Sequence, residues 1–209
     1  MYNPLLYIAL FAGIIPLIVL FLKKRAFVFS EPIVPFAWLT FIASIYESVF
    51  SILLEINIAY WFQIYPLFEF LAIYYFFLKL FKSNYKTHLT ISIIGMLAVY
   101  SISFVFWNED NIFLSKAVNT IPITLFVFYF LFIWLRQLFK KMEIPDLLDN
   151  SIFYFVTGFF MYYSTTLALF LMSSFIFTSE LYFYDYWLVN VIATLILRIC
   201  LIVGVWKMK

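Results

Sequence analysis

The sequence contains seven apolar stretches of about 20 residues, and this pattern restricts the possible fold more than any other feature. A helix needs about 20 mostly apolar residues to cross a bilayer, whereas a spanning β-strand needs only about ten and alternates polar with apolar residues. The stretches are about twice that strand length and apolar on all sides, so we predict helices. They cover residues 4–22, 33–53, 58–81, 88–107, 113–136, 150–176 and 183–206.

The composition agrees with a lipid environment. The chain of 209 residues is 67% hydrophobic and 11% charged, whereas soluble domains are about half apolar and a quarter charged. A soluble protein of this size has too little interior for so much apolar surface. We therefore predict an all-α, single-domain bundle over residues 1–209, with the lipid bilayer as its partner and no nucleic acid. Because glycine is scarce, at four residues, large aromatic side chains rather than close glycine contacts should fill the helix interfaces.

The basic residues predict the orientation of the bundle. Of thirteen Lys and Arg, eleven fall at one set of alternating helix ends, and acidic residues dominate the other set. Positive residues favour the cytoplasmic side, so the N-terminus should lie outside and the C-terminus in the cytoplasm, which requires an odd number of crossings. All six tryptophans lie near predicted helix ends, where the membrane interface favours them. We expect a multi-pass protein of the cell (inner) membrane whose first helix is retained rather than cleaved as a signal peptide.

Three ionisable residues lie within the predicted spans, namely Glu47, Glu69 and Arg198. Charged groups inside a membrane usually face the bundle interior and often mark ligand or ion pathways. Asn190, Thr194 and Arg198 recur every four residues and so share one helix face. A second stripe on residues 33–53 and just beyond comprises Ser44, Glu47, Ser48, Ser51 and Glu55.

These stripes predict a polar pocket that opens outward and is acidic near its mouth. Glu69 and Arg198 would lie at its floor. The candidate residues for a ligand or ion pathway are Glu47, Glu69, Asn190, Thr194 and Arg198. The alternative is structural: either carboxylate pairs with the guanidinium to neutralise buried charge and to fix the register of the helices.

The sequence lacks the residues that several kinds of catalytic or cofactor site require. One histidine, His88, and one cysteine, Cys200, cannot form a Cys/His zinc site, so no metal is predicted and the zinc-dependent seven-helix hydrolases are excluded. No lysine lies in the middle of the final helix, which excludes retinal binding. No nucleophile-elbow, zincin or nucleotide-binding motif occurs. We therefore assign no catalytic residue and no cofactor.

Two segments carry a resemblance to known membrane proteins. They are Tyr65-Pro66-Leu67-Phe68-Glu69-Phe70 and the final helix from Trp187 to Lys207. Both resemble small bacterial seven-helix membrane proteins and the membrane-embedded input halves of bacterial sensor kinases. The resemblance implies membrane signalling. Since no kinase domain follows the final helix, signalling would need a separate cytoplasmic or membrane protein partner.

Three functions are compatible with these features. The first is a non-enzymatic sensing or partner-binding module with an outward-facing polar pocket. The second is a transporter or channel subunit coupled through Glu47 and Glu69, although no inverted repeat is visible. The third is a membrane-embedded lipid hydrolase that uses the same two carboxylates as an acid–base pair.

Overall fold

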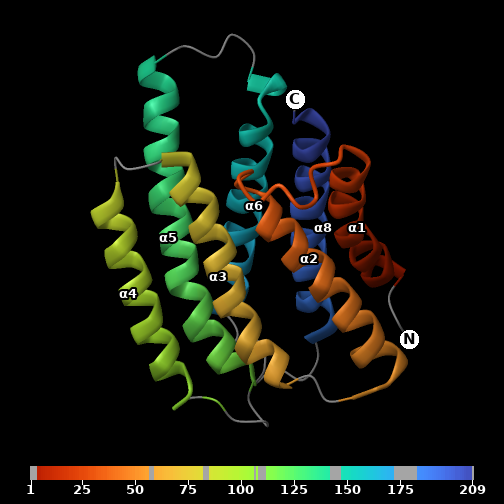
Figure 1. Cartoon of the computed structure of the whole chain (residues 1–209). Coiled ribbons are helices and arrows are strands. Elements are labelled where there is room, and N and C mark those ends of the chain that lie inside the picture. The colour runs from red at the N-terminus through yellow and green to blue at the C-terminus, as the bar shows by residue number, and fades with distance from the viewer. Residues whose placement is uncertain are drawn as a thin grey trace.

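The computed structural model describes residues 4–56, 59–81, 85–105, 107, 112–141, 147–171 and 183–208 (Figure 1). Within these ranges the chain is helical and has no strand, which confirms the predicted all-α class. The helices are α1 Pro4–Leu22, α2 Val34–Tyr46, α3 Ala59–Phe81, α4 Lys86–Ser103, α5 Ile112–Lys141, α6 Ser151–Leu171 and α8 Phe183–Lys207. A π-helix, η1 (Glu47–Leu53), continues α2, and a short 3₁₀ turn, η2 (Leu147–Asp149), precedes α6.

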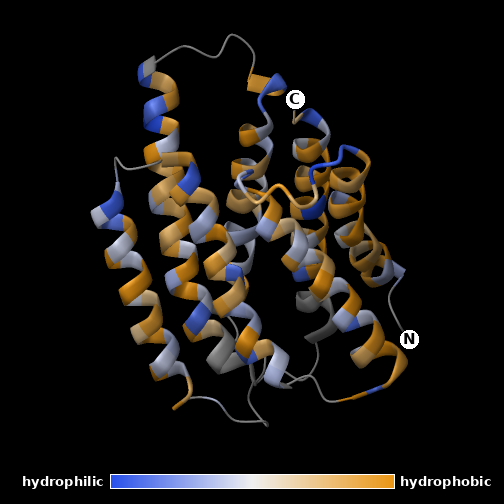
Figure 2. Ribbon diagram, viewed as in Figure 1, coloured by the Kyte–Doolittle hydropathy of each residue, from blue (hydrophilic) through white to orange (hydrophobic). Residues whose placement is uncertain are grey.

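Six helices of the described chain are long and apolar enough to cross a membrane: α1, α2 with η1, α3, α5, α6 and α8. α4 is not among them, because polar Lys86 and His88 occupy its first turn. Phe11 and Phe132 on the outer surface are 67% and 68% exposed, whereas the charged Arg198 is only 6% exposed. Figure 2 likewise shows apolar residues along the helices and polar ones gathered at many of their ends. This distribution suits lipid as the solvent and fits a multi-pass membrane protein.

The six apolar helices form a closed ring. Neighbours pack in the order α1, α2, α3, α5, α6, α8 and back to α1, and α4 packs on the outside against α5 and α3. Figure 1 shows α4 at one edge of the bundle. The side chains inside this ring therefore come from six helices that are distant in sequence.

Aromatic side chains from α2, α3 and α6 fill one half of the interior of the ring. Phe36, Phe76, Phe77, Phe155 and Phe159 are at most 2% exposed. The ring of Phe159 lies edge-on to Phe36 and Phe76, at centroid distances of 4.9 and 5.4 Å. Edge-to-face contacts of this kind favour aromatic pairs beyond simple burial. The prediction that aromatic residues fill the interfaces is correct for this half.

Close glycine contacts occur in addition to the aromatic packing, at three of the four glycines. A Cβ at Gly158 of α6 would lie 2.8 Å from Cβ of Cys200, and one at Gly204 of α8 would lie 2.3 Å from the Phe155 ring. A Cβ at Gly13 of α1 would lie 2.1 Å from Oγ of Ser44. These glycines let α1, α2, α6 and α8 approach closely, as small residues do in membrane bundles.

Three predicted helix boundaries differ from the structure or cannot be compared with it. α5 ends at Lys141 rather than residue 136, because the added residues are mostly strong helix formers. α4 ends at Ser103 rather than residue 107, where the Ser103 hydroxyl donates to the carbonyl of Tyr100 and so competes with the helix. The predicted extension of α6 to residue 176 lies outside the described residues.

The C-terminal ends of α1, α3, α5 and α8 lie at one end of the bundle, which we call the basic end (Figure 1). It carries Lys23, Lys79, Lys86, Lys140 and Lys207. Nζ of Lys23 donates to the carbonyls of Trp206 and Met208, both at 2.6 Å, and so ties the end of α1 to the end of α8. Nζ of Lys207 forms an ion pair with Asp149 at 2.7 Å.

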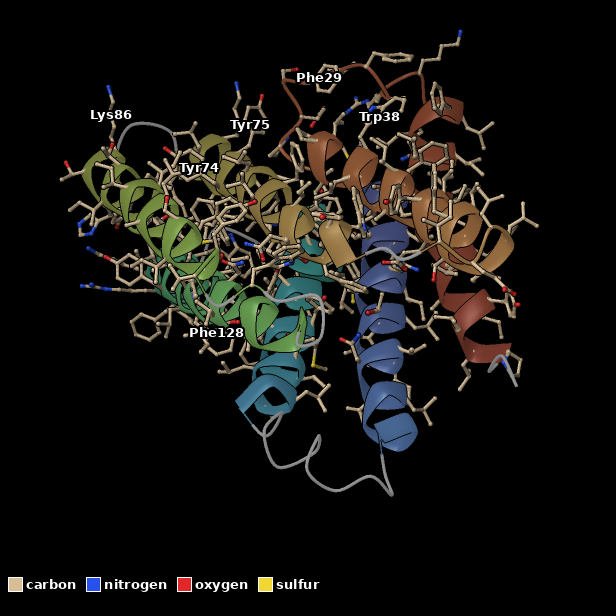
Figure 3. The ribbon with its side chains drawn as sticks, turned by 90° about the horizontal axis from the view of Figure 1, so that it is seen from below. Phe29, Trp38, Tyr74, Tyr75, Lys86 and Phe128 are labelled. Carbon is tan, nitrogen blue, oxygen red and sulfur yellow. The ribbon has the colours of Figure 1, made fainter. Side chains whose placement is uncertain are left out.

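The segment that joins α1 to α2 is anchored at the same end. Nε1 of Trp38 donates to the carbonyl of Ala26 at 2.8 Å, and the hydroxyl of Tyr75 on α3 donates to the carbonyl of Phe29. Phe29, Trp38 and Tyr75 lie along the same edge of the view in Figure 3. These contacts hold the connection against the bundle.

Candidate ligand pocket

A cavity of about 200 Å³ lies inside the ring, toward the end opposite to the basic end. It is bounded by α1, α2, η1, α3, α6 and α8. Its polar and aromatic lining comprises Glu47, Ser51, Trp61, Phe62, Tyr65, Tyr162, Asn190, Thr194 and Arg198. The structure thus places four of the five candidate residues around one cavity, and Glu69 lies outside its lining.

The π-helix η1 positions the acidic wall of the cavity. Glu47 is its first residue, and the amide of Leu54 bonds the carbonyl of Val49, which is the five-residue spacing of a π-helix. Such segments are rare and occur often at functional sites, because they change which residues share a face. Glu47 and Ser51 line the cavity, whereas Glu55 is exposed and lies outside the lining. The regular stripe predicted on this helix is therefore only partly present.

Arg198 lies about 13 Å below the end of α8, at the standard helical rise. Its Nη1 donates to the carbonyl of Ala9 on α1, and the residue also lines the cavity. Gly13 makes room for this contact, since a Cβ there would lie 2.9 Å from the guanidinium carbon. Arg198 therefore joins α8 to α1 and presents a fixed positive charge to the cavity.

The two carboxylates have different surroundings. Glu47 is half-buried and lies at the cavity wall with Arg198. Glu69 is 7% exposed and lies outside the cavity lining. Of the two carboxylates, only Glu47 lines the same cavity as the guanidinium of Arg198.

The cavity also has an aromatic wall that the sequence interpretation missed. Trp61 stacks on Tyr46 at a centroid distance of 4.4 Å, and Tyr46 stacks on Phe50 at 4.6 Å. Trp61 and Tyr65 both line the cavity and precede Glu69 at intervals of four residues, so the three share one face of α3. This spacing was the signal in the sequence that would have identified the wall.

A second polar cluster lies between α3, α4 and α5, away from the cavity. The hydroxyl of Ser103 accepts hydrogen bonds from Nε2 of Gln63 at 2.9 Å and from Nδ2 of Asn119 at 3.0 Å. All three residues are buried. A buried amide needs such a partner, so this cluster joins α4 to the ring.

Comparison of the chain with protein-family models, with curated proteins and with solved structures gave no match. The site is therefore interpreted from its own chemistry. Its arrangement is that of a small polar cavity in a helical membrane bundle, with a buried cation, a carboxylate and aromatic side chains around it.

Proposed function

We propose that the protein is a non-enzymatic sensing module of the bacterial inner membrane, which binds a small polar ligand in this cavity from the outer side. The supporting observation is that Glu47 of η1 lines one cavity together with Asn190, Thr194 and Arg198 of α8, which is distant from η1 in sequence. Binding sites typically combine a mostly apolar cavity with a few convergent polar groups.

The distribution of charge supports an outward-facing cavity. Basic residues mark the cytoplasmic side of membrane proteins, and the cavity lies toward the end opposite to the basic end. With the basic end in the cytoplasm, α1 would start outside and α8 would end inside, which requires α4 to cross the membrane in addition to the six long apolar helices. The ligand then reaches the cavity from outside the cell.

The contacts of α1 and α8 provide a route for the signal. Arg198 joins the two helices at the cavity, and Lys23 joins them again at the basic end. A ligand that binds the guanidinium would change the first contact and shift α8 relative to α1. A partner protein at the basic end would detect that shift, because both helices end there.

The transporter or channel function and the lipid-hydrolase function receive less support. A transport pathway needs an opening toward the basic end, where Phe36, Phe76 and Phe159 pack together. An acid–base pair for hydrolysis needs both carboxylates at the substrate, but Glu69 does not line the cavity.

Ligand-induced stabilisation of the purified protein tests this proposal. In detergent, a panel of small polar metabolites should include at least one that raises the unfolding temperature. Thr194→Phe should abolish that shift by filling the cavity. Ile192→Phe, on the exposed face of the same helix, should leave it intact. The same shift in both variants, or no shift with any compound, would overturn the proposal.

A further inference from the structure

The cavity is lined by two residues of opposite charge, Arg198 of α8 and Glu47 of η1. We propose that the ligand is a small zwitterion with an ammonium group at Glu47 and a carboxylate or phosphate group at Arg198. This inference rests on the proposed function and specifies the chemical class of the ligand.

The Arg198 side suits an acid group. A guanidinium is planar, and its paired N–H groups match the two oxygens of a carboxylate or phosphate. The bond to the Ala9 carbonyl uses one of its five N–H groups and fixes its position. Asn190 lies two turns away on the same face of α8 and adds an amide that can donate to an oxygen.

The Glu47 side suits an ammonium group. The carboxylate supplies the opposite charge, and Trp61, Tyr65 and Tyr162 place aromatic rings around the same cavity. The faces of aromatic rings attract cations, and this attraction is stronger where water is excluded. A carboxylate beside aromatic rings is a typical environment for an ammonium group.

Charge balance favours a ligand that carries both groups. Glu47 and Arg198 line the same cavity and carry opposite charges. A ligand with a single charge would pair with one of these side chains and add a net charge to the cavity, beside the other side chain. An uncompensated charge is costly in a medium of low dielectric constant. A zwitterion brings no net charge and gives each side chain an opposite partner.

The size of the cavity and its position define two sources for such a ligand. A cavity of about 150 Å³ holds benzene, so one of about 200 Å³ has room for roughly six to ten non-hydrogen atoms. Free amino acids are of this size, and so is the phosphoethanolamine headgroup of a lipid. Leu10 lines both the cavity and an apolar groove on the outside of α1, so lipid chains can lie beside the cavity.

The test compares three molecules of similar size on the purified full chain: 4-aminobutyrate, butyrate and butylammonium. Binding is measured by calorimetry in detergent, with the methyl ester of phosphoethanolamine, a phosphodiester zwitterion like the lipid headgroup, as a fourth probe. At least one zwitterion should bind at least tenfold more tightly than either singly charged compound. Glu47→Gln should remove that preference, and Arg198→Lys should weaken binding of the acid group. Glu55→Gln is the control, because Glu55 lies outside the cavity lining.

A second arm tests the lipid source in nanodiscs. Phosphatidylethanolamine should raise the unfolding temperature more than phosphatidylglycerol does, and Glu47→Gln should remove the difference. Support from either arm identifies the source. If a singly charged compound binds as tightly as every zwitterion and phosphatidylethanolamine gives no advantage, the inference fails but the binding function stands. If no probe and no lipid binds, the inference fails, and the metabolite panel decides separately whether the binding function stands.

Discussion

Gly13 of α1 is the position where one added methyl group should do most damage at the site. A Cβ there would lie 2.1 Å from Oγ of Ser44, 2.9 Å from Cζ of Arg198 and 3.0 Å from its Nε. Real Cβ atoms essentially never approach within 3.0 Å, so α2 or the guanidinium must move. Gly13→Ala should therefore destabilise the protein and disturb the bond between Arg198 and Ala9.

Gly95 provides a matched control, because a Cβ there would have no atom within 4 Å. In a helix interior, alanine is intrinsically favoured over glycine by about 0.8–1.0 kcal/mol, and both variants share that gain. Their difference isolates the overpacking cost, which is about 1–3 kcal/mol in well-packed cores. For a chain of this size, each kcal/mol corresponds to about 2–4 °C in unfolding temperature.

The assay is thermal unfolding of the purified variants in detergent, followed by tryptophan fluorescence. Gly13→Ala should unfold at a clearly lower temperature than Gly95→Ala. Adding Ser44→Ala to Gly13→Ala removes the closest contact and should recover part of the loss. Equal stability of the two single variants would refute the argument that Gly13 is needed for close packing.

Three further substitutions test the interior, each by thermal unfolding. Phe159→Ala should lower the free energy of unfolding by about 3–5 kcal/mol, because it opens a cavity among the buried aromatic side chains. Phe132, which is 68% exposed, is the control, and Phe132→Ala should change stability little. Equal effects of the two substitutions would refute the ring arrangement. Ser103→Ala should lower the free energy of unfolding by about 1–3 kcal/mol, because the buried side-chain amides of Gln63 and Asn119 lose their shared acceptor. Ser101→Ala, on the exposed face of the same helix, is the control and should be nearly neutral. Ser44→Ala should be neutral or stabilising, because its buried hydroxyl has no hydrogen-bond partner; a large loss would contradict that assignment.

The helices could be predicted from the sequence because lipid imposes a simple rule on it. A spanning helix needs a long apolar run, and the charged residues must lie at the ends or face inward. The bounds of α1 at residues 4–22 agree with the prediction for this reason. The stripe of Asn190, Thr194 and Arg198 was visible for a similar reason, since regular helical spacing places them on one face.

The rest of the site depends on features that regular spacing does not reveal. Glu47 and Ser51 of η1 line the cavity, whereas Glu55 does not, because η1 ends at Leu53 and Glu55 has a positive φ of 52°. Arg198 donates to the backbone carbonyl of Ala9, and a contact with a backbone group cannot be recognised from residue types in the sequence. The role of Gly13 arises only once α1, α2 and α8 are packed together.

The most direct test of the central claim is whether water-soluble reagents reach the cavity from outside the cell. Thr194→Cys in a Cys200→Ala background places a single thiol in the cavity wall, because Cys200 is the chain's one native cysteine. A membrane-impermeant maleimide added to intact cells should label it, and a bound zwitterion should slow that labelling. Labelling only from the cytoplasmic side, or none even in permeabilised cells, would contradict an outward-facing ligand pocket.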